Sequence, residues 1–306
     1  MIKNSKILFL VVFGFLFITC NQKDKSKSDK ESILKGSMDI TVDETLVPIV
    51  EDQVAVFEGT YDAKITIKPK SEAELINDLL NQNATVAFTA RDLTKEEREI
   101  FNKKKIAPRV TQVATDAIAF ISNKDNNDTL IALKSVINFI QGKPTTNIKG
   151  LVFDNPNSST VRYLKTLAGT KDIPKEGVFS FKTNEEVIKF VSENKGMIGV
   201  VGVNWLSQPS PKMKDDIVKI NVLSVKGLTG DKFIAPTQNN IAEGTYPLAR
   251  DLYIINCQGY SGLGIGFASF VGGDIGQRII LKSGLLPIRV PGRKLNVRSE
   301  IINEKE

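Results

Sequence analysis

Two kinds of apolar segment alternate along most of the chain, and this alternation is the feature that most restricts the fold. Short runs typical of β-strands, such as 39–42, 63–67 and 85–88, are each followed by a segment with helical spacing or a helix-start signal. A repeated strand–helix order favours parallel sheets covered by helices. The sequence therefore predicts an α/β fold with mostly parallel strands from Ser37 onward.

Local signals mark where several of the helices should begin and end. Thr94 followed by Glu97 is a capping box, and Asn184 is expected to cap a later helix. Gly169 and Gly284 follow apolar periodic segments, as expected for residues that close a helix. The further strands are predicted at 117–121, 151–153, 197–201 and 252–256, and the helices at 46–57, 72–80, 130–140, 161–168 and 274–283.

The first nineteen residues have the pattern of a signal peptide. A short basic start precedes the apolar run 7–18, which is too short to cross a bilayer but long enough for a signal-peptide core. The run ends just before Cys20, a position that resembles a lipobox although Phe17 and Thr19 depart from the usual residues. We expect cleavage before Cys20 and lipidation of its thiol. The alternative is an ordinary signal peptide followed by a chance cysteine.

Residues 20–35 are rich in lysine, serine and aspartate and contain few apolar side chains. Such a segment buries too little apolar surface to fold by itself, so we expect a flexible tether. Together with the lipid, the tether predicts an extracytoplasmic protein anchored to a membrane.

Composition excludes several classes of function. The chain has no histidine, which removes Ser-His-Asp and Cys-His catalysis and every imidazole metal ligand. Its two cysteines are too few for a zinc site, so we expect no metal and no cofactor. Catalysis by carboxylates or lysine alone stays open, but we expect no catalytic residues. The net charge of +6 is spread along the chain, which argues against nucleic-acid binding.

Three strand-to-helix junctions carry hydroxyl groups at or beside the predicted helix start. They contain Thr45, Thr89 and the run Ser158, Ser159 and Thr160. A helix N-terminus presents free N–H groups and a positive dipole end, and hydroxyls add neutral donors, so converging junctions could bind an oxyanion. For any single junction, ordinary N-capping is the alternative.

Five segments follow one another in an order that points to a known family. They are 42–48, 89–97, 157–160, 246–253 with the sequence Y-P-L-A-R-D-L-Y, and 276–277 together with 284–287. With these segments the chain resembles the phosphate-binding proteins of phosphate ABC transporters along nearly its whole mature length.

This resemblance implies a two-lobed fold of the periplasmic binding protein-like type II class, with the ligand between the lobes. Residues 36–117 and 246–306 would form one lobe and 118–245 the other, with crossovers near 117–121 and 252–255 as the hinge. The implied function is capture of an inorganic oxyanion, most of all phosphate, by a monomer that closes and docks on permease subunits of an importer. No chemistry is implied.

The resemblance also implies which residues bind the ligand. Thr45, Thr89, Ser158, Ser159 and Thr160 would donate hydroxyl hydrogen bonds.

Charged residues complete the implied site. Arg91 would grip the anion, and Asp92 would accept a proton from it. Asp43 and Glu44 stand where the family has serines, so they would repel the anion unless they accept its proton or turn away and meet it only through their backbone N–H groups.

The chain departs from the family pattern in a second place and leaves other functions open. Asp154 occupies a position where the family often has arginine, which leaves Arg91 and Arg162 as the nearby cations. One alternative is a lipoprotein that senses an anion or scaffolds other proteins without a transport partner. Another is a histidine-free hydrolase that uses Asp43, Glu44 or Asp92. We expect Trp205 and Cys257 to serve packing.

Overall fold

The computed structural model describes residues 31–145 and 148–290. The predicted signal peptide and the predicted lipidation site Cys20 lie outside these residues. Within them, no helix is long and apolar enough to cross a membrane.

Ten strands form one continuous curled sheet whose central path is β2-β1-β3-β12-β4-β8-β6-β7. β1 is parallel to both β2 and β3, whereas β12 enters antiparallel between β3 and β4. The first half of this path consists of β1 (Gly36–Asp43), β2 (Ala63–Lys70), β3 (Val86–Thr89), β4 (Arg109–Asn123) and β12 (Ala249–Asn256). The second half consists of β6 (Gly150–Phe153), β7 (Val178–Ser180) and β8 (Met197–Gly202), while β9 (Ile220–Val222) and β13 (Leu286–Pro287) pair with β4 outside the path.

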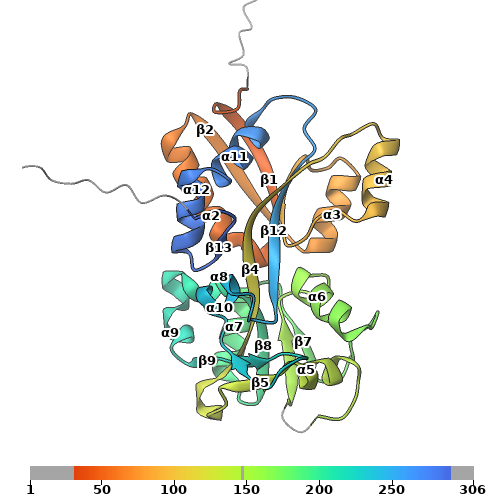
Figure 1. The fold of residues 1–306 in the computed structure, drawn as a ribbon, viewed down its shortest axis with the longest axis vertical. Coiled ribbons are helices and arrows are strands. Elements are labelled where there is room, and N and C mark those ends of the chain that lie inside the picture. Colours follow the sequence, from red (N-terminus) through yellow and green to blue (C-terminus); the bar gives the residue numbers. More distant parts are fainter. Residues whose placement is uncertain (1–30, 146–147, 291–306) are drawn as a thin grey trace, which may run out of the picture.

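Helices cover both faces of the first half of the sheet (Figure 1). One face carries α2 (Val47–Thr60), α11 (Leu263–Val271) and α12 (Asp274–Lys282), and the other carries α3 (Glu72–Leu80) and α4 (Lys95–Lys103). The apolar cores on these faces draw their residues from 38–114 and 252–285. We call this unit lobe one.

A separate apolar core, formed by residues between Ala117 and Leu248, defines the unit that we call lobe two. Its helices are α5 (Leu133–Ile140), α6 (Ser159–Ala168), α7 (Asn184–Glu193), α8 (Val203–Ser207), α9 (Lys214–Ile217) and α10 (Gln238–Ala242). A small second sheet consists of β11 (Phe233–Ile234), β10 (Ser224–Lys226) and β5 (Leu130–Ala132). Short 3-10 turns lie at η1 (Glu44–Leu46), η2 (Lys124–Asn126) and η3 (Pro211–Met213). Tyr246 and Leu248 belong to this core, so the chain returns to lobe one near Ala249.

Two adjacent strands, β4 and β12, connect the lobes (Figure 1). β4 pairs with β12 along 109–117 and with β8 along 118–122, so one strand belongs to both halves of the sheet. The lobes therefore meet where Ala117 faces Ala249 and Asp116 faces Arg250. The two-lobed α/β architecture is as predicted. The expectation of mostly parallel strands is wrong, because β4 pairs antiparallel with β8, β9, β12 and β13, and β12 pairs antiparallel with β3.

Two predicted elements differ from the structure, and the helix α11 was not predicted. Leu130 begins the strand β5 rather than a helix, because 130–132 pairs with β10 and α5 starts only at Leu133. The cap of α7 is Thr183, whose hydroxyl accepts from the Glu186 amide, and Asn184 is the first helical residue. The glycine-rich segment before α12 forms an additional helix, α11, that the sequence did not indicate.

The end of the predicted flexible tether is ordered. The Glu31 carboxylate accepts hydrogen bonds from the Leu263 amide and the Tyr260 hydroxyl, both 3.0 Å away, at the start of α11. The Ile33 carbonyl passes so close to Gly266 that a Cβ there would lie 1.6 Å from its oxygen. Glycine at this position therefore allows the segment 31–35 to cross α11.

Candidate ligand-binding cleft

Parallel strands β1 and β3 end side by side at the junction between the lobes. β1 ends at Asp43 and β3 at Thr89, and both side chains are fully buried. The Asp43 carboxylate caps the following turn by accepting hydrogen bonds from the Thr45 amide at 3.1 Å and the Thr45 hydroxyl at 2.9 Å. The turn thus fixes the Thr45 hydroxyl at the boundary of lobe one.

The first residues of α6 form the opposing surface in lobe two. Ser158 caps the helix by accepting from the Val161 amide, and its hydroxyl lies 2.8 Å from that of Thr160. Thr160 in turn donates to Asp154 at the end of β6 over 3.0 Å. All three hydroxyl residues at this helix start are buried, so their hydroxyls are directed into the protein rather than toward solvent: Ser158, Ser159 and Thr160.

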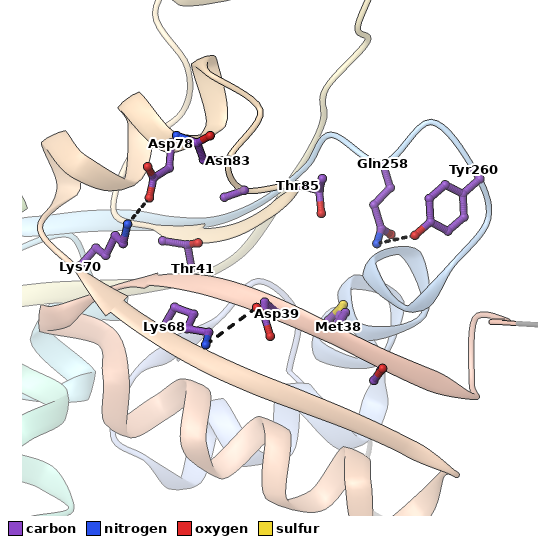
Figure 2. A pocket seen from close by; sticks show the side chains of 12 residues that line it. Met38, Asp39, Thr41, Lys68, Lys70, Asp78, Asn83, Thr85, Gln258 and Tyr260 are labelled. Atoms are coloured by element: carbon purple, nitrogen blue, oxygen red, sulfur yellow. Dashed lines mark hydrogen bonds and ion pairs between the residues drawn. The ribbon is translucent and has the colours of Figure 1, made fainter.

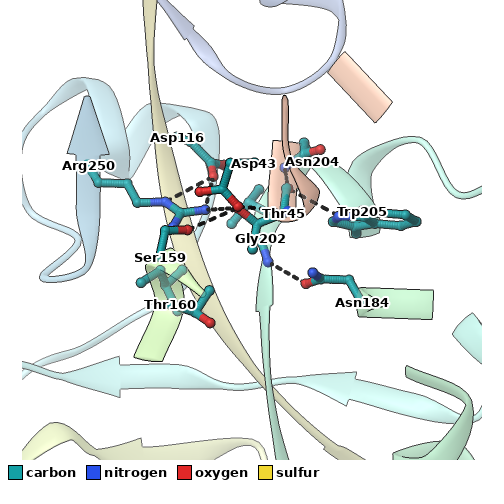
Figure 3. Close-up of polar contacts among 12 residues, drawn as sticks. Asp43, Thr45, Asp116, Ser159, Thr160, Asn184, Gly202, Asn204, Trp205 and Arg250 are labelled. Carbon is teal, nitrogen blue, oxygen red and sulfur yellow. Dashed lines mark hydrogen bonds and ion pairs between the residues drawn. The ribbon is translucent and has the colours of Figure 1, made fainter. Parts of the chain in front are cut away.

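Arg250 joins the two surfaces (Figure 3). The hydroxyls of Thr45 and Ser159, from opposite lobes, share a hydrogen bond of 3.2 Å. The Arg250 guanidinium donates to Ser159 at 2.8 Å and to Thr45 at 3.1 Å. It also pairs with the Asp116 carboxylate at 3.0 Å. We call Thr45, Asp116, Ser159 and Arg250 the cleft cluster.

Sequence reasoning missed Arg250 and Asp116, although both lie in segments that it examined. They face each other as cross-strand neighbours on β12 and β4, and the Arg250 side chain is only 2% exposed. The available signal was strand alternation, because Arg250 occupies the same inward register as Leu252 and Ile254. A charged residue at an inward strand position requires a buried partner.

Burial changes the acidity of the carboxyl groups around Arg250. Desolvation raises the pKa of Asp43 to about 6, against the opposing effect of the Arg250 charge. Burial likewise raises the pKa of Asp116, and Arg250 again opposes it. Within the described residues, Asp43 Oδ2, Asp116 Oδ1 and Thr89 Oγ1 are buried without a hydrogen-bond partner. Such oxygens can each accept a proton donor.

A second contact between the lobes involves Glu44, Asp154 and Asn184. Asn184 donates to Glu44 from its backbone amide at 3.0 Å and from Nδ2 at 2.6 Å. The same Nδ2 lies 3.4 Å from Asp154 Oδ2, while the side-chain oxygen of Asn184, Oδ1, accepts from the Gly202 amide at 3.2 Å. Burial, reinforced by the negative charge of Asp154, raises the pKa of Glu44 to about 8. Burial also raises the pKa of Asp154.

Trp205 and Asn204 hold the backbone of the Thr45 turn. The Thr45 carbonyl accepts from Asn204 Nδ2 at 2.8 Å and from the Trp205 indole Nε1 at 3.1 Å. Trp205 also packs against the core of lobe two, as expected for a packing residue. Its polar edge, however, contributes directly to the contact between lobes (Figure 3).

The structure does not bring Arg91 and Asp92 into the cleft cluster. Arg91 donates to the Glu97 carboxylate at 2.7 and 2.8 Å and to Glu72 at 3.2 Å. Glu97 is available because it is the reciprocal residue of the α4 capping box. Asp92 accepts from the Leu93 amide and from Arg98, with 43% of its side chain exposed. Arg162, the other expected cation, also binds Glu72.

A separate pocket lies on the face of lobe one between β1, β2 and α3, with a volume of about 430 Å³ (Figure 2). Its two lysines are already paired with acids: Lys68 with Asp39 at 3.9 Å, and Lys70 with Asp78. The positive charges of this pocket are therefore compensated locally, as the charge of Arg250 is by Asp116.

Comparison with known sequences places this geometry in a family context. A family model described as a PBP superfamily domain matches residues 28–274. The phosphate-binding protein PstS of Borreliella burgdorferi is 25% identical over 312 aligned positions, which cover 94% of this chain and 99% of that protein. PstS of Staphylococcus epidermidis is 27% identical over 267 positions, covering 82% of this chain and 78% of its own.

Solved structures share the fold. A Clostridium perfringens protein solved with bound phosphate superposes with a TM-score of 0.69 at 19% identity, covering 83% of this chain and all of its own (100%). An ABC-type phosphate transport receptor from Vibrio cholerae gives a TM-score of 0.61 at 17% identity, covering 82% and 100%. Since the family model spans most of the sequence and the two-lobed architecture agrees with it, the chain belongs to the PBP superfamily.

Proposed function

We propose that this protein captures inorganic phosphate in the cleft between its lobes and delivers it to an ABC importer on the extracytoplasmic side of a membrane. The observation that carries the proposal is the cleft cluster. Neutral hydroxyls from both lobes and one buried guanidinium meet at the start of α6, in a family whose sequence relatives are named phosphate-binding proteins.

The cluster contains donors that a ligand could take over. Thr45, Ser159 and Arg250 hydrogen-bond to one another across the cleft. An oxyanion would replace these mutual bonds with bonds to its own oxygens, and the positive end of α6 would favour its charge. Because the donors come from both lobes, the closed form offers the ligand more contacts than an open one. A ligand drives closure through this difference in affinity.

The unpartnered oxygens of Asp43 and Asp116 suggest how phosphate is distinguished from sulfate. A protonated oxyanion can donate to a buried carboxylate, whereas fully ionised sulfate leaves that acceptor unpaired beside a like charge. An unpaired buried acceptor costs ~1–3 kcal/mol. The sequence expectation that Asp92 plays this role is replaced, in the proposal, by Asp43.

Other parts of the proposal rest on sequence and family rather than on the described coordinates. They are the lipid on Cys20, a monomeric state, docking on permease subunits and binding without chemistry. The lobe division proposed from sequence, 36–117 with 246–306 and 118–245, needs its second boundary moved to about Ala249, because Tyr246 and Leu248 pack in lobe two. Turnover of a phosphate ester by the purified protein would favour the hydrolase alternative instead.

The direct test is a ligand-induced melting shift, measured with phosphate, arsenate, sulfate and molybdate at equal concentration. We expect phosphate to give the largest rise in melting temperature, because a ligand that binds only the folded protein stabilises it by mass action. A larger shift with sulfate or molybdate would contradict the assignment. The absence of a shift with all four anions would contradict oxyanion capture itself.

A further inference from the structure

Glu44 and Asp154 bring two buried carboxyl groups together from opposite lobes. Glu44 follows β1 in lobe one and is 8% exposed, whereas Asp154 follows β6 in lobe two and is 0% exposed. Both accept from the side-chain amide of Asn184. This juxtaposition exists only while the lobes are closed, because each lobe supplies one of the acids.

The charged groups near the pair do not neutralise it. Asp43 is another acid, which raises the pKa of Glu44 further. Arg250 pairs with Asp116, and Glu72 is bound by Arg91 and Arg162. Asp154 receives the Thr160 hydroxyl, and Glu185, next to Asn184, is exposed. Among the described residues, no lysine or arginine forms an ion pair with Glu44 or Asp154.

Two buried carboxyl groups that accept from the same amide nitrogen repel each other when both are ionised, so the closed form favours one proton on the pair. In an open form each carboxyl would be hydrated separately and would lose its proton at ordinary pH. We propose that Glu44 and Asp154 form a proton-dependent latch: closure of the lobes takes up one proton from solvent, the pair shares it, and opening returns it. The latch rests on the proposed function only for the identity of the ligand that the closed lobes hold.

The direction of the pH effect follows from the acidity of Glu44. Its pKa rises from the ordinary value of 4.5 to about 8 in the closed form. A carboxyl group whose pKa is higher in the closed form stabilises that form. The stabilisation is complete at pH values below the pKa of the open form, and it is lost as the pH rises to the pKa of the closed form. The closed-to-open ratio should therefore fall by up to about tenfold per pH unit between roughly 4.5 and 8.

The chain contains a built-in reporter of this equilibrium. Trp205 is its single tryptophan, and the indole Nε1 donates across the cleft to the Thr45 carbonyl. Separation of the lobes would break that bond and hydrate the ring. The emission maximum of Trp205 should therefore move to longer wavelength when the lobes open.

The test is a titration of the ligand-free protein from pH 5 to 9, following Trp205 emission and the radius of gyration from small-angle X-ray scattering. We expect wild type to open as pH rises. Glu44→Gln removes the group with the most raised pKa, and Asp154→Asn removes a charge that raises it further, so both profiles should become shallower than that of wild type, most of all Glu44→Gln above a pH of about 6, the pKa of Asp43. Circular dichroism at each pH confirms that the fold is intact.

Glu51→Gln is the matched control, because Glu51 lies with Trp205 along the same groove but has no role in the pair. Its profile should remain that of wild type. A wild-type profile in Glu44→Gln, or a flat profile in Glu51→Gln, would overturn the latch. Phosphate titration of the same proteins separates the two proposals, since failure to bind phosphate would refute the ligand while leaving pH-dependent opening measurable.

Discussion

Arg250 and Arg91 are both partly or fully buried arginines near the junction of the lobes, yet their surroundings differ. Arg91 is bound by two carboxylates, Glu72 and Glu97, which together compensate its charge and occupy its donors. Arg250 has one carboxylate partner, Asp116, and directs its remaining donors at hydroxyl groups. A ligand anion can replace hydroxyls more easily than it can displace two carboxylates. We therefore expect Arg250, rather than Arg91, to exchange its partners for an anion.

The largest effect is expected on the stability of the protein when Arg250 is removed. Arg250→Ala leaves Asp116 buried without its partner, so the free energy of unfolding should fall by ~3–5 kcal/mol. Urea denaturation at pH 7 measures the change. The double variant Arg250→Met with Asp116→Asn removes both charges and should recover much of the loss. Equal destabilisation of the double variant would show that the ion pair is not the cause.

Phosphate affinity should respond to the cleft cluster and not to Arg91. Ser159→Ala removes a hydroxyl that touches both Arg250 and Thr45, and a hydrogen bond to a charged group is worth ~1.5–3 kcal/mol. Affinity should therefore fall roughly ten- to a hundredfold by calorimetry. Arg91→Ala should change it by less than about threefold, corresponding to under ~0.7 kcal/mol. A larger loss of affinity in Arg91→Ala than in Ser159→Ala would place the site at the loop between β3 and α4, which contains Arg91.

Asp43 and Asp92 extend the comparison to the preference for phosphate over sulfate. Asp43→Asn removes the buried acceptor, so the preference for phosphate over sulfate should drop at least tenfold, or ~1.4 kcal/mol. Asp92→Asn should leave that ratio unchanged, because Asp92 bonds to Leu93 and Arg98 outside the cluster. Competition of both anions for each variant gives the ratio. A loss confined to Asp92→Asn would reverse the assignment.

The smallest effect on stability is expected from the exposed ion pair beside Arg91. The pair between Asp92 and Arg98 is nearly half exposed, and such pairs contribute ~0.2–1 kcal/mol. Arg98→Ala should lower the free energy of unfolding within that range, and the loss should shrink further in 0.5 M salt. A salt-independent loss above this range would mean that the arginine contributes packing instead.

Local patterns in the sequence predicted much of the fold and one side of the site. The strand ends that carry Asp43 and Thr89, and the capped start of α6, follow from residues close together in the chain. The partners of Arg250 could not be predicted in the same way. Its hydrogen bonds reach Thr45 and Ser159, 205 and 91 positions away, and depend on how β12 enters the sheet between β3 and β4.

Arg91 shows what the sequence could not reveal about a charged residue. Its position beside a helix start resembles that of a ligand-binding arginine, and nothing local to it distinguishes the two roles. Glu97 could be foreseen as part of a capping box, but Glu72 reaches Arg91 from a different helix and also binds Arg162 of the other lobe. Whether a charged side chain is free to bind a ligand therefore depends on contacts that only the assembled lobes make.

The position of Arg250 along β12 has a consequence for how a ligand is first met. Arg250 and Asp116 face each other where β4 and β12 pass from one lobe to the other, at the pivot of any rotation between them. Atoms at a pivot move least, so the guanidinium and its carboxylate keep their geometry whether the lobes are apart or together. Under the proposed function, an arriving anion would find its counter-charge preassembled, and only the hydroxyls of Thr45 and Ser159 would move to meet it.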